Sequence, residues 1–191
     1  ADDVLYTPGE WSWVGPLYGF VLAGLYYGTA ILGDADPQFD PERTLGLVEQ
    51  YNVVSIAAPT TVYRVMMQVP KAAERFDLSS LRVVFEGGES LGQSVVEWVD
   101  EAIDEVAVHE GYGQTEAGVF IGDCEALGVE HRPGYMGKPV PGTEIRVLDP
   151  DTAEPLDRGE VGELALQYEG NPACFKGFWN APEKTEERIQ N

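Results

Sequence analysis

The sequence predicts an α/β protein: a parallel-rich sheet with flanking helices, followed by a small β subdomain. Between about residues 40 and 110, short apolar runs typical of strands alternate with segments of helical periodicity, the order found in parallel sheets with βα crossovers. After Pro133, short strands and turns follow one another without helical periodicity until residues 181–189. We therefore expect an α/β part over residues 1–133 and an incomplete β-rich part over residues 134–191.

Composition excludes several classes of protein. The 191 residues are 43% hydrophobic and 10% aromatic, which is enough for a packed core and too much for a disordered chain. Twelve Lys and Arg against 33 Asp and Glu give a formal net charge of -21, so nucleic acid is not an expected partner. The acids are dispersed and only four of the bases are lysine, a balance that indicates a halophilic protein. An ordinary acidic cytosolic protein is the alternative.

The two cysteines, Cys124 and Cys174, are fifty residues apart, which indicates neither a disulfide framework nor a metal cluster. The beginning of the sequence carries no apolar signal with a basic flank, so the expected location is cytoplasmic.

Residues 11–33 contain no charge and are numerous enough to cross a bilayer. Pro16, five glycines and the lack of a basic flank argue instead for a buried helix over Gly15–Tyr27 and a strand over Thr29–Leu32. We expect no membrane span. A membrane-anchored acidic interaction protein remains an alternative.

The segment from residue 40 to residue 66 predicts a helix, a strand and a second helix. Asp40 can cap the first helix, Pro41 fits its first turn, and apolar residues recur at helical spacing as far as Tyr51. The apolar run 53–58 is a strand. The second helix is expected to open at Pro59. Its start either contributes to a ligand pocket, or its apolar side chains, Val62 and Met66 among them, simply face the core.

Two strands then lead into polar, glycine-rich stretches. Strand 81–85 is followed by an exit turn over residues 86–90 and a helix over residues 92–103, and strand 105–108 leads into residues 109–116. Ligands of parallel α/β sheets bind at the carboxyl ends of strands, so the two stretches are expected to share one crevice. Either each is only a tight turn, or together they form a ligand site. Residues 144–148 and 161–166 are the later strands.

Residues 111–116, Gly-Tyr-Gly-Gln-Thr-Glu, resemble the Tyr-Gly-x-Thr-Glu motif of the adenylate-forming superfamily of acyl-CoA synthetases, luciferases and peptide-synthetase adenylation domains. The acetyl-CoA and medium-chain acyl-CoA synthetase branch is the most similar. Five further stretches resemble the family in the same order: residues 58–64, 87–91, 133–139, 159–164 and 175–180.

The resemblance implies an enzyme of fatty acid metabolism that joins a carboxylate to CoA through an acyl-adenylate, using ATP and Mg²⁺. Tyr112 would stack on adenine, Thr115 would donate a hydrogen bond to the α-phosphate, and Glu116 would hold Mg²⁺; Thr115 and Glu116 are the catalytic candidates. The implied ATP-binding residues are Gly88, Glu89, Ser90, Glu110, Gly111, Tyr112, Gly113, Gln114 and Thr115. The implied acyl-pocket residues are Trp13, Pro59, Thr60 and Tyr63, with a plain core role as the alternative for Trp13.

The sequence also departs from the family pattern. It contains no Ser/Thr/Gly-rich phosphate loop with lysine, no Thr-Gly-Asp motif, no hinge and no C-terminal catalytic lysine. These departures predict an internal piece of a larger enzyme that is inactive by itself. The alternative is a non-catalytic nucleotide- or acyl-binding module. Chain length of the acyl group and oligomeric state do not follow from the sequence.

Overall fold

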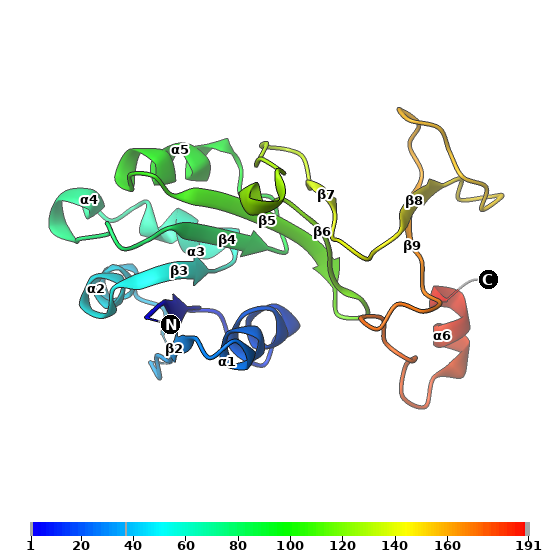
Figure 1. Ribbon diagram of the computed structural model, residues 1–191, viewed down its shortest axis with the longest axis horizontal. Helices are drawn as coiled ribbons and strands as arrows, with labels where there is room; N and C mark the ends of the chain where they lie inside the picture. The colour runs from blue at the N-terminus through cyan, green and yellow to red at the C-terminus, as the bar shows by residue number, and fades with distance from the viewer. Residues whose placement is uncertain (1, 37, 190–191) are drawn as a thin grey trace.

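The computed structural model describes residues 2–36 and 38–189. Its larger part is a seven-stranded sheet in the order β2-β1-β3-β4-β5-β6-β7 (Figure 1). The first five strands in this order are parallel, whereas β6 and β7 pair antiparallel. The strands are β1 (Val4–Tyr6), β2 (Ala30–Leu32), β3 (Val53–Ala57), β4 (Val83–Gly87), β5 (Ala107–Gln114), β6 (Gly118–Gly122) and β7 (Lys138–Pro139).

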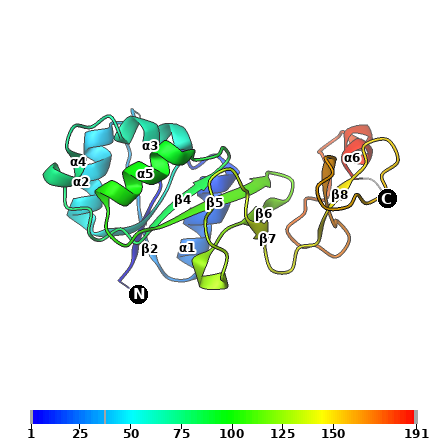
Figure 2. The ribbon, with the colours of Figure 1, turned by 90° about the horizontal axis from the view of Figure 1, so that it is seen from above.

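One face of this sheet is covered by helices (Figure 2). The helices are α2 (Pro41–Tyr51), α3 (Thr60–Met66), α4 (Ala72–Arg75) and α5 (Gln93–Ala102). Their apolar residues, including Leu45, Met66 and Val99, are buried against strand residues such as Ile56 and Val84. The alternation of strands with amphipathic helices thus produces the predicted α/β core.

The α2 helix begins as the sequence indicates. The Asp40 side chain accepts a hydrogen bond from the Arg43 N–H at 3.0 Å, and Pro41 occupies the first turn. The helix ends at Asn52, whose left-handed backbone (φ 48°) closes the last turn before β3.

A second, two-stranded antiparallel sheet follows the first. It consists of β8 (Ile145–Leu148) and β9 (Glu163–Leu166), and it lies beyond β7 together with α6 (Pro182–Arg188) (Figure 1). The predicted small β subdomain is therefore present. The boundary at residue 133 stays a prediction; β7, just after it, pairs with β6 of the large sheet.

The uncharged segment forms a helix, but the predicted burial is wrong. A π-helical stretch, η1 (Gly15–Leu22), continues into α1 (Ala23–Tyr26). Tyr18, Leu25 and Tyr26 are 66%, 58% and 83% exposed. An uncharged segment is expected to have an apolar surface, but its sequence does not show whether other residues cover that surface. Among the described helices, none is long and apolar enough to cross a membrane.

The strand that leads into residues 109–116 is also longer than predicted. The strand does not stop at Val108: β5 runs to Gln114 and forms a hairpin with β6, so most of the motif is strand and only residues 115–117 are turn. Parallel pairing with β4 and antiparallel pairing with β6 supply hydrogen-bond partners on both sides of β5. This pairing sustains a strand through glycines that the local sequence marks as a turn.

Candidate functional site

The two predicted ligand-binding stretches lie side by side. β4 and β5 are parallel neighbours, with Glu86 opposite Glu110 and Gly87 opposite Gly111. The Leu91 N–H donates to Glu110 Oε1 at 2.5 Å, which ties the end of the first stretch to the strand that carries the second. The predicted convergence at the carboxyl ends of the strands is thus present in the fold.

The turn at residues 88–90 is held by buried polar groups beneath it. The Glu89 N–H donates to Glu86 Oε1 at 2.9 Å, and the Thr60 hydroxyl donates to the Ser90 carbonyl at 3.3 Å. Gly88 has φ +138°, a conformation that disfavours any side chain. Since the three turn residues are themselves exposed, the turn presents backbone and short side chains to a ligand.

Glu86 was not among the residues singled out from the sequence. Its side chain is 1% exposed, and this burial raises its pKa to about 7, against the opposing effect of the Glu89 N–H. The signal that could have identified it is a carboxylate within an otherwise apolar strand, next to a glycine pair.

Two glycines let β5 lie close to both of its neighbours, β4 and β6, around Tyr112. A Cβ on Gly113 would lie 2.1 Å from the Gly118 carbonyl oxygen, and one on Gly111 would lie 2.8 Å from the Phe85 ring. Neither glycine has a positive φ, so they serve close approach and not a sharp turn. Tyr112 packs edge-on against Phe120, with ring centroids 5.5 Å apart, and stays 42% exposed.

The tip of the hairpin carries the two catalytic candidates. The Ala117 N–H donates to the Gln114 carbonyl at 3.0 Å, and the Phe175 N–H donates to the Glu116 carbonyl at 2.7 Å, so the backbone of the tip is anchored. Gln114 itself is engaged, since its Oε1 accepts from Arg188 at 2.8 Å.

Within residues 2–36 and 38–189, the Thr115 hydroxyl and the Glu116 carboxylate make no hydrogen bond or ion pair. Both side chains are therefore available to a ligand. The oxygen donors of Glu116 fit Mg²⁺, which commonly uses one or two protein carboxylates.

The four acyl-pocket candidates have different environments. Pro59 is exposed at the carboxyl end of β3, beside Thr60. Tyr63 is 1% exposed, and its hydroxyl lies 2.8 Å from the Phe85 carbonyl and 3.2 Å from the Ile56 carbonyl, so both the ring and the hydroxyl are engaged inside the fold. Burial and desolvation raise the pKa of Tyr63 far above its ordinary value.

Trp13 is 68% exposed, which excludes the alternative of a plain core tryptophan.

Sequence reasoning missed a buried polar cluster directly behind β5. Glu110 turns its carboxylate inward, where it meets Asp123 from the end of β6 and His131 from the following loop. Asp123 Oδ1 accepts the Glu110 N–H at 2.8 Å and lies 3.2 Å from His109 Nδ1. The sequence gives no spacing signal for this cluster, because the fold brings together residues from three separate segments.

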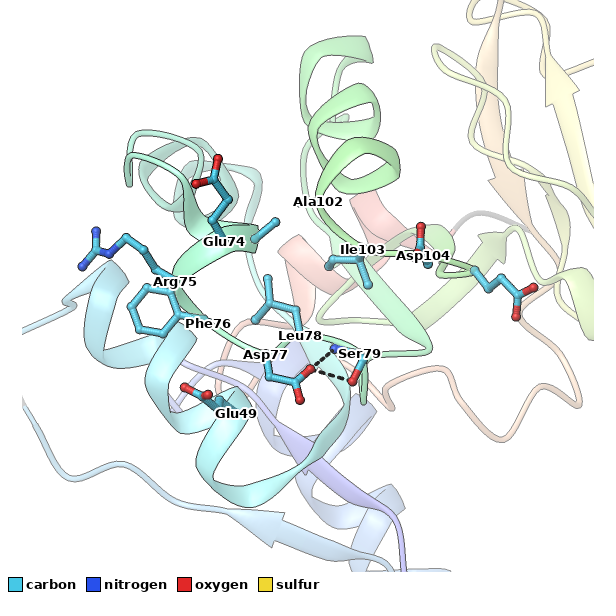
Figure 3. A pocket seen from close by; sticks show the side chains of 12 residues that line it. Glu49, Glu74, Arg75, Phe76, Asp77, Leu78, Ser79, Ala102, Ile103 and Asp104 are labelled. Carbon is cyan, nitrogen blue, oxygen red and sulfur yellow. Dashed lines mark hydrogen bonds between the residues drawn. The ribbon is translucent and has the colours of Figure 1, made fainter.

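A cavity in the described part of the chain lies away from these motifs. It has a volume of about 640 Å³ and is lined by Asp77, Ser79 and Asp104 among others (Figure 3). Ser79 precedes β4 and Asp104 precedes β5, so this cavity opens at the amino ends of the strands. Its position is opposite to the edge where α/β sheets bind ligands.

Known proteins match both the sequence and the fold. The family described as AMP-binding enzyme matches residues 1–179. The 4-coumarate–CoA ligase 5 of Oryza sativa subsp. japonica is 33% identical over 98% of this chain and 34% of its own length. The acetyl-coenzyme A synthetase of Bacillus subtilis (strain 168) is 32% identical over 97% of this chain and 32% of its own length.

Solved structures agree. An acyl-CoA synthetase from Brucella canis superposes with a TM-score of 0.87 at 29% identity, over 100% of this chain and 34% of that one. ATP-bound MatB from Rhodopseudomonas palustris gives 0.86 at 25% identity, over 100% of this chain and 36% of that one.

The fold and the paired motifs define an adenylate-forming protein. The chain belongs to the AMP-binding enzyme family, which confirms the superfamily predicted from residues 111–116. It spans about a third of the length of the curated relatives that it matches.

Proposed function

We propose that this chain forms part of an AMP-forming acyl-CoA synthetase of the acetyl- and medium-chain type. In the first half-reaction a carboxylate oxygen attacks the α-phosphorus of ATP, and the bond to pyrophosphate breaks. In the second, the sulfur of CoA attacks the acyl carbon, AMP leaves with the bonding electrons, and the thiol proton passes to solvent. The observation that carries the proposal is the convergence of residues 88–90 and 111–116 on one edge of the sheet.

In this proposal Tyr112 and the turn at residues 88–90 hold the adenine. The 42% exposure of Tyr112 supports a stacking role, because the ring is fixed at one edge by Phe120 and still accessible. The remaining wall residues, Gly111, Gly113 and Gln114, act through their backbone, since two have no side chain and the third is held by Arg188. Glu110 positions the turn through Leu91 instead of touching the base.

Thr115 and Glu116 act at the α-phosphate. The Thr115 hydroxyl donates a hydrogen bond to an α-phosphate oxygen as negative charge develops there. Mg²⁺, when bound, supplies charge neutralisation between the two anionic reactants. Glu116 would hold it, because its carboxylate makes no hydrogen bond or ion pair with any described residue. In a chain of net charge -21, repulsion of ATP makes this cation more important.

The acyl group would lie beside Pro59 and Thr60 at the end of β3, the strand next to β4. Trp13, which is exposed before η1, would contact the acyl group in the complete enzyme. Tyr63 would support this wall from behind, through its hydroxyl contact with the Phe85 carbonyl. We place the enzyme in fatty acid metabolism, in the cytoplasm of a halophilic cell.

The test is an assay of the full-length protein that carries this chain. It is incubated with ATP, Mg²⁺, CoA and a panel of acetate, medium-chain and aromatic carboxylates, and both pyrophosphate and the acyl-CoA are measured. We expect pyrophosphate release that depends on a carboxylate, with the highest kcat/KM among acetate and medium-chain acids. ATP binding without pyrophosphate release would support a non-catalytic nucleotide-binding module instead. A preference for aromatic acids would move the protein to another branch of the family.

A further inference from the structure

The cluster of Glu110, Asp123 and His131 behind β5 has the geometry of a metal site. The side chains of Glu110, Asp123 and His131 are 8%, 0% and 8% exposed. One potential ligand atom from each of these residues lies within 4.8 Å of the other two. The Nδ1 atom is 2.8 Å from Asp123 Oδ2 and 3.5 Å from Glu110 Oε2.

In both carboxylates one oxygen accepts a backbone N–H and the other is directed at His131, with Asp123 Oδ2 within hydrogen-bond distance of Nδ1. Glu110 uses Oε1 to accept the Leu91 N–H, and Asp123 uses Oδ1 to accept the Glu110 N–H. Oε2 and Oδ2 then point to the same place, toward His131. Backbone hydrogen bonds therefore fix the direction of both carboxylates, as the outer shell of a metal site does.

The charge of the cluster is unbalanced. Across the described part of the chain, neither carboxylate is paired with a lysine or an arginine, and their ion-pair partners are His109 and His131. Two adjacent carboxylates held away from water repel each other and require a positive counter-charge. A divalent cation would supply two charges at the point where Glu110 Oε2 and Asp123 Oδ2 approach His131 Nδ1.

The second nitrogen of His131 is also enclosed by the protein. Nε2 is buried and has no hydrogen-bond partner among the described residues. His131 also lines a cavity of about 550 Å³ whose other walls include Asp100, Glu125 and Glu130 and, among the described lining residues, no lysine or arginine. These carboxylates are hydrogen-bond acceptors.

The two tautomers of His131 differ in the role of Nδ1. A neutral imidazole with its proton on Nδ1 donates a hydrogen bond to Asp123 Oδ2. With the proton on Nε2, the Nδ1 lone pair is directed at two carboxylate oxygens, and in this tautomer the imidazole can bind a metal through Nδ1. The acidic cavity also provides an entry path for a cation.

We propose that Glu110 Oε2, Asp123 Oδ2 and His131 Nδ1 bind one Zn²⁺ or a similar divalent first-row transition metal, with water as a fourth ligand. One nitrogen and two carboxylate oxygens form a donor set that Zn²⁺ takes in tetrahedral sites, at about 2.0–2.2 Å. Ligands on such a tetrahedron are about 3.4 Å apart. The observed separations of 2.8 and 3.5 Å from Nδ1 need only small adjustments.

The bound ion would tie three segments together: β5, the end of β6 and the loop at His131. Through Glu110 it would also steady Leu91 and the turn at residues 88–90. Its role is structural, and it is separate from the cation proposed at Glu116. The inference does not depend on the proposed enzymatic activity.

The test uses the full-length protein, freed of metal with a chelator and carrying the changes Cys124→Ser and Cys174→Ser, which remove thiolate ligands. ZnCl₂ is titrated by calorimetry in the presence of excess Mg²⁺, and the melting temperature is measured with and without Zn²⁺. We expect one saturable site per chain and a higher melting temperature with Zn²⁺. Asp123→Asn and Glu110→Gln, which keep an acceptor for the backbone N–H, are expected to weaken Zn²⁺ binding at least tenfold.

The control variant is Asp100→Asn, which lies in the cavity wall without being a ligand; it should bind Zn²⁺ within about threefold of the unchanged protein. Anomalous diffraction at the zinc edge from crystals of the unchanged protein should place the ion among the three ligand atoms, and this measurement requires no variant to fold. Absence of saturable binding, an ion located elsewhere, or binding that Asp123→Asn leaves unchanged would each overturn the proposal.

Discussion

At the scale of single residues, Thr115 and Glu116 are expected to affect a different kinetic quantity from Tyr112. Thr115 and Glu116 would act where charge develops on the α-phosphate, so Thr115→Val and Glu116→Gln should lower kcat, each by about a hundredfold, or roughly 3 kcal/mol. Tyr112 stacks on a base that does not react. Tyr112→Ala should therefore cost about 1–3 kcal/mol, mostly as a higher KM for ATP.

The measurement is kcat and KM for ATP in the full-length protein at saturating Mg²⁺. Tyr51→Ala is the matched control for Tyr112, because Tyr51 is 45% exposed and precedes β3 at the opposite edge of the sheet. Glu49→Gln is the matched control for Glu116, because Glu49 lines the cavity at the amino ends of the strands. A Glu116→Gln enzyme whose kcat stays within about twofold of the unchanged enzyme would remove Glu116 from the mechanism.

Glu86 makes the stability of the fold depend on pH. Its pKa is about 7 in the folded state, against 4.5 without the fold, because burial disfavours the carboxylate. Between pH 4.5 and about 7, the folded protein therefore keeps the Glu86 proton, whereas the unfolded chain has released it. Stability from this group is fully present below pH 4.5 and is lost as the pH rises through about 7.

Glu86→Gln should remove that dependence while keeping an acceptor for the Glu89 N–H. Between pH 4.5 and 8, the free energy of unfolding of the variant should rise relative to the unchanged protein by up to about 3 kcal/mol. Urea denaturation at a series of pH values measures the difference, and Glu101→Gln on the exposed side of α5 is the control. Parallel stability profiles for Glu86→Gln and the unchanged protein would show that Glu86 keeps its ordinary pKa.

At the scale of elements, the hairpin of β5 and β6 depends on Gly113. A Cβ there would meet the Gly118 carbonyl oxygen at 2.1 Å, and this atom belongs to the backbone and cannot rotate away. Gly113→Ala should force the two strands apart at a cost of about 1–3 kcal/mol or more. Gly19→Ala is the control, because nothing lies within 4 Å of a Cβ at that exposed helical position.

Thermal denaturation of the two variants measures this difference. In a helix, alanine in place of glycine is neutral or stabilising, by at most about 1 kcal/mol, so Gly19→Ala should not lower the melting temperature. Equal melting temperatures for the two variants would mean that the hairpin tolerates a side chain at Gly113.

The same elements indicate which parts of the fold the sequence could predict. The sequence predicts helix α2 with its cap because Asp40 and Pro41 act on neighbouring backbone groups, and local signals suffice for that. It does not predict the extension of β5 to Gln114, because pairing with β4 and β6 overrides the local preference of two glycines. The same reason explains the missed cluster: Glu110, Asp123 and His131 become neighbours only through the sheet.

The candidate ligand-binding stretches were found because each is continuous in the sequence and follows a strand. Their convergence was predicted from the parallel order of β4 and β5, and it is present. The sequence does not predict the exposure of η1 and α1. The hydrophobicity of a segment indicates that burial would be favourable, but it does not show which residues cover the segment.

At the scale of the whole molecule, the dominant property is the charge of -21. The ion pairs that lysine and arginine make among the described residues are few and mostly exposed, such as Arg75–Glu42 and Arg82–Asp3, and exposed pairs contribute little to stability. Self-repulsion among the dispersed carboxylates is therefore poorly compensated. Salt should relieve it, because the Debye length falls from about 10 Å at 0.1 M to about 3 Å at 1 M.

The melting temperature should consequently rise between 0.1 M and 1 M KCl. A variant with Glu101→Gln, Glu163→Gln and Glu169→Gln removes three exposed negative charges that have no ion-pair partner in the described part of the chain. Repulsion scales with the square of the net charge, so the increase caused by KCl should shrink by about a quarter. A general effect of salt on hydrophobic burial would act equally on both proteins. A melting temperature that stays flat or falls with KCl would refute adaptation to salt and leave the family membership untouched, since that rests on sequence and fold.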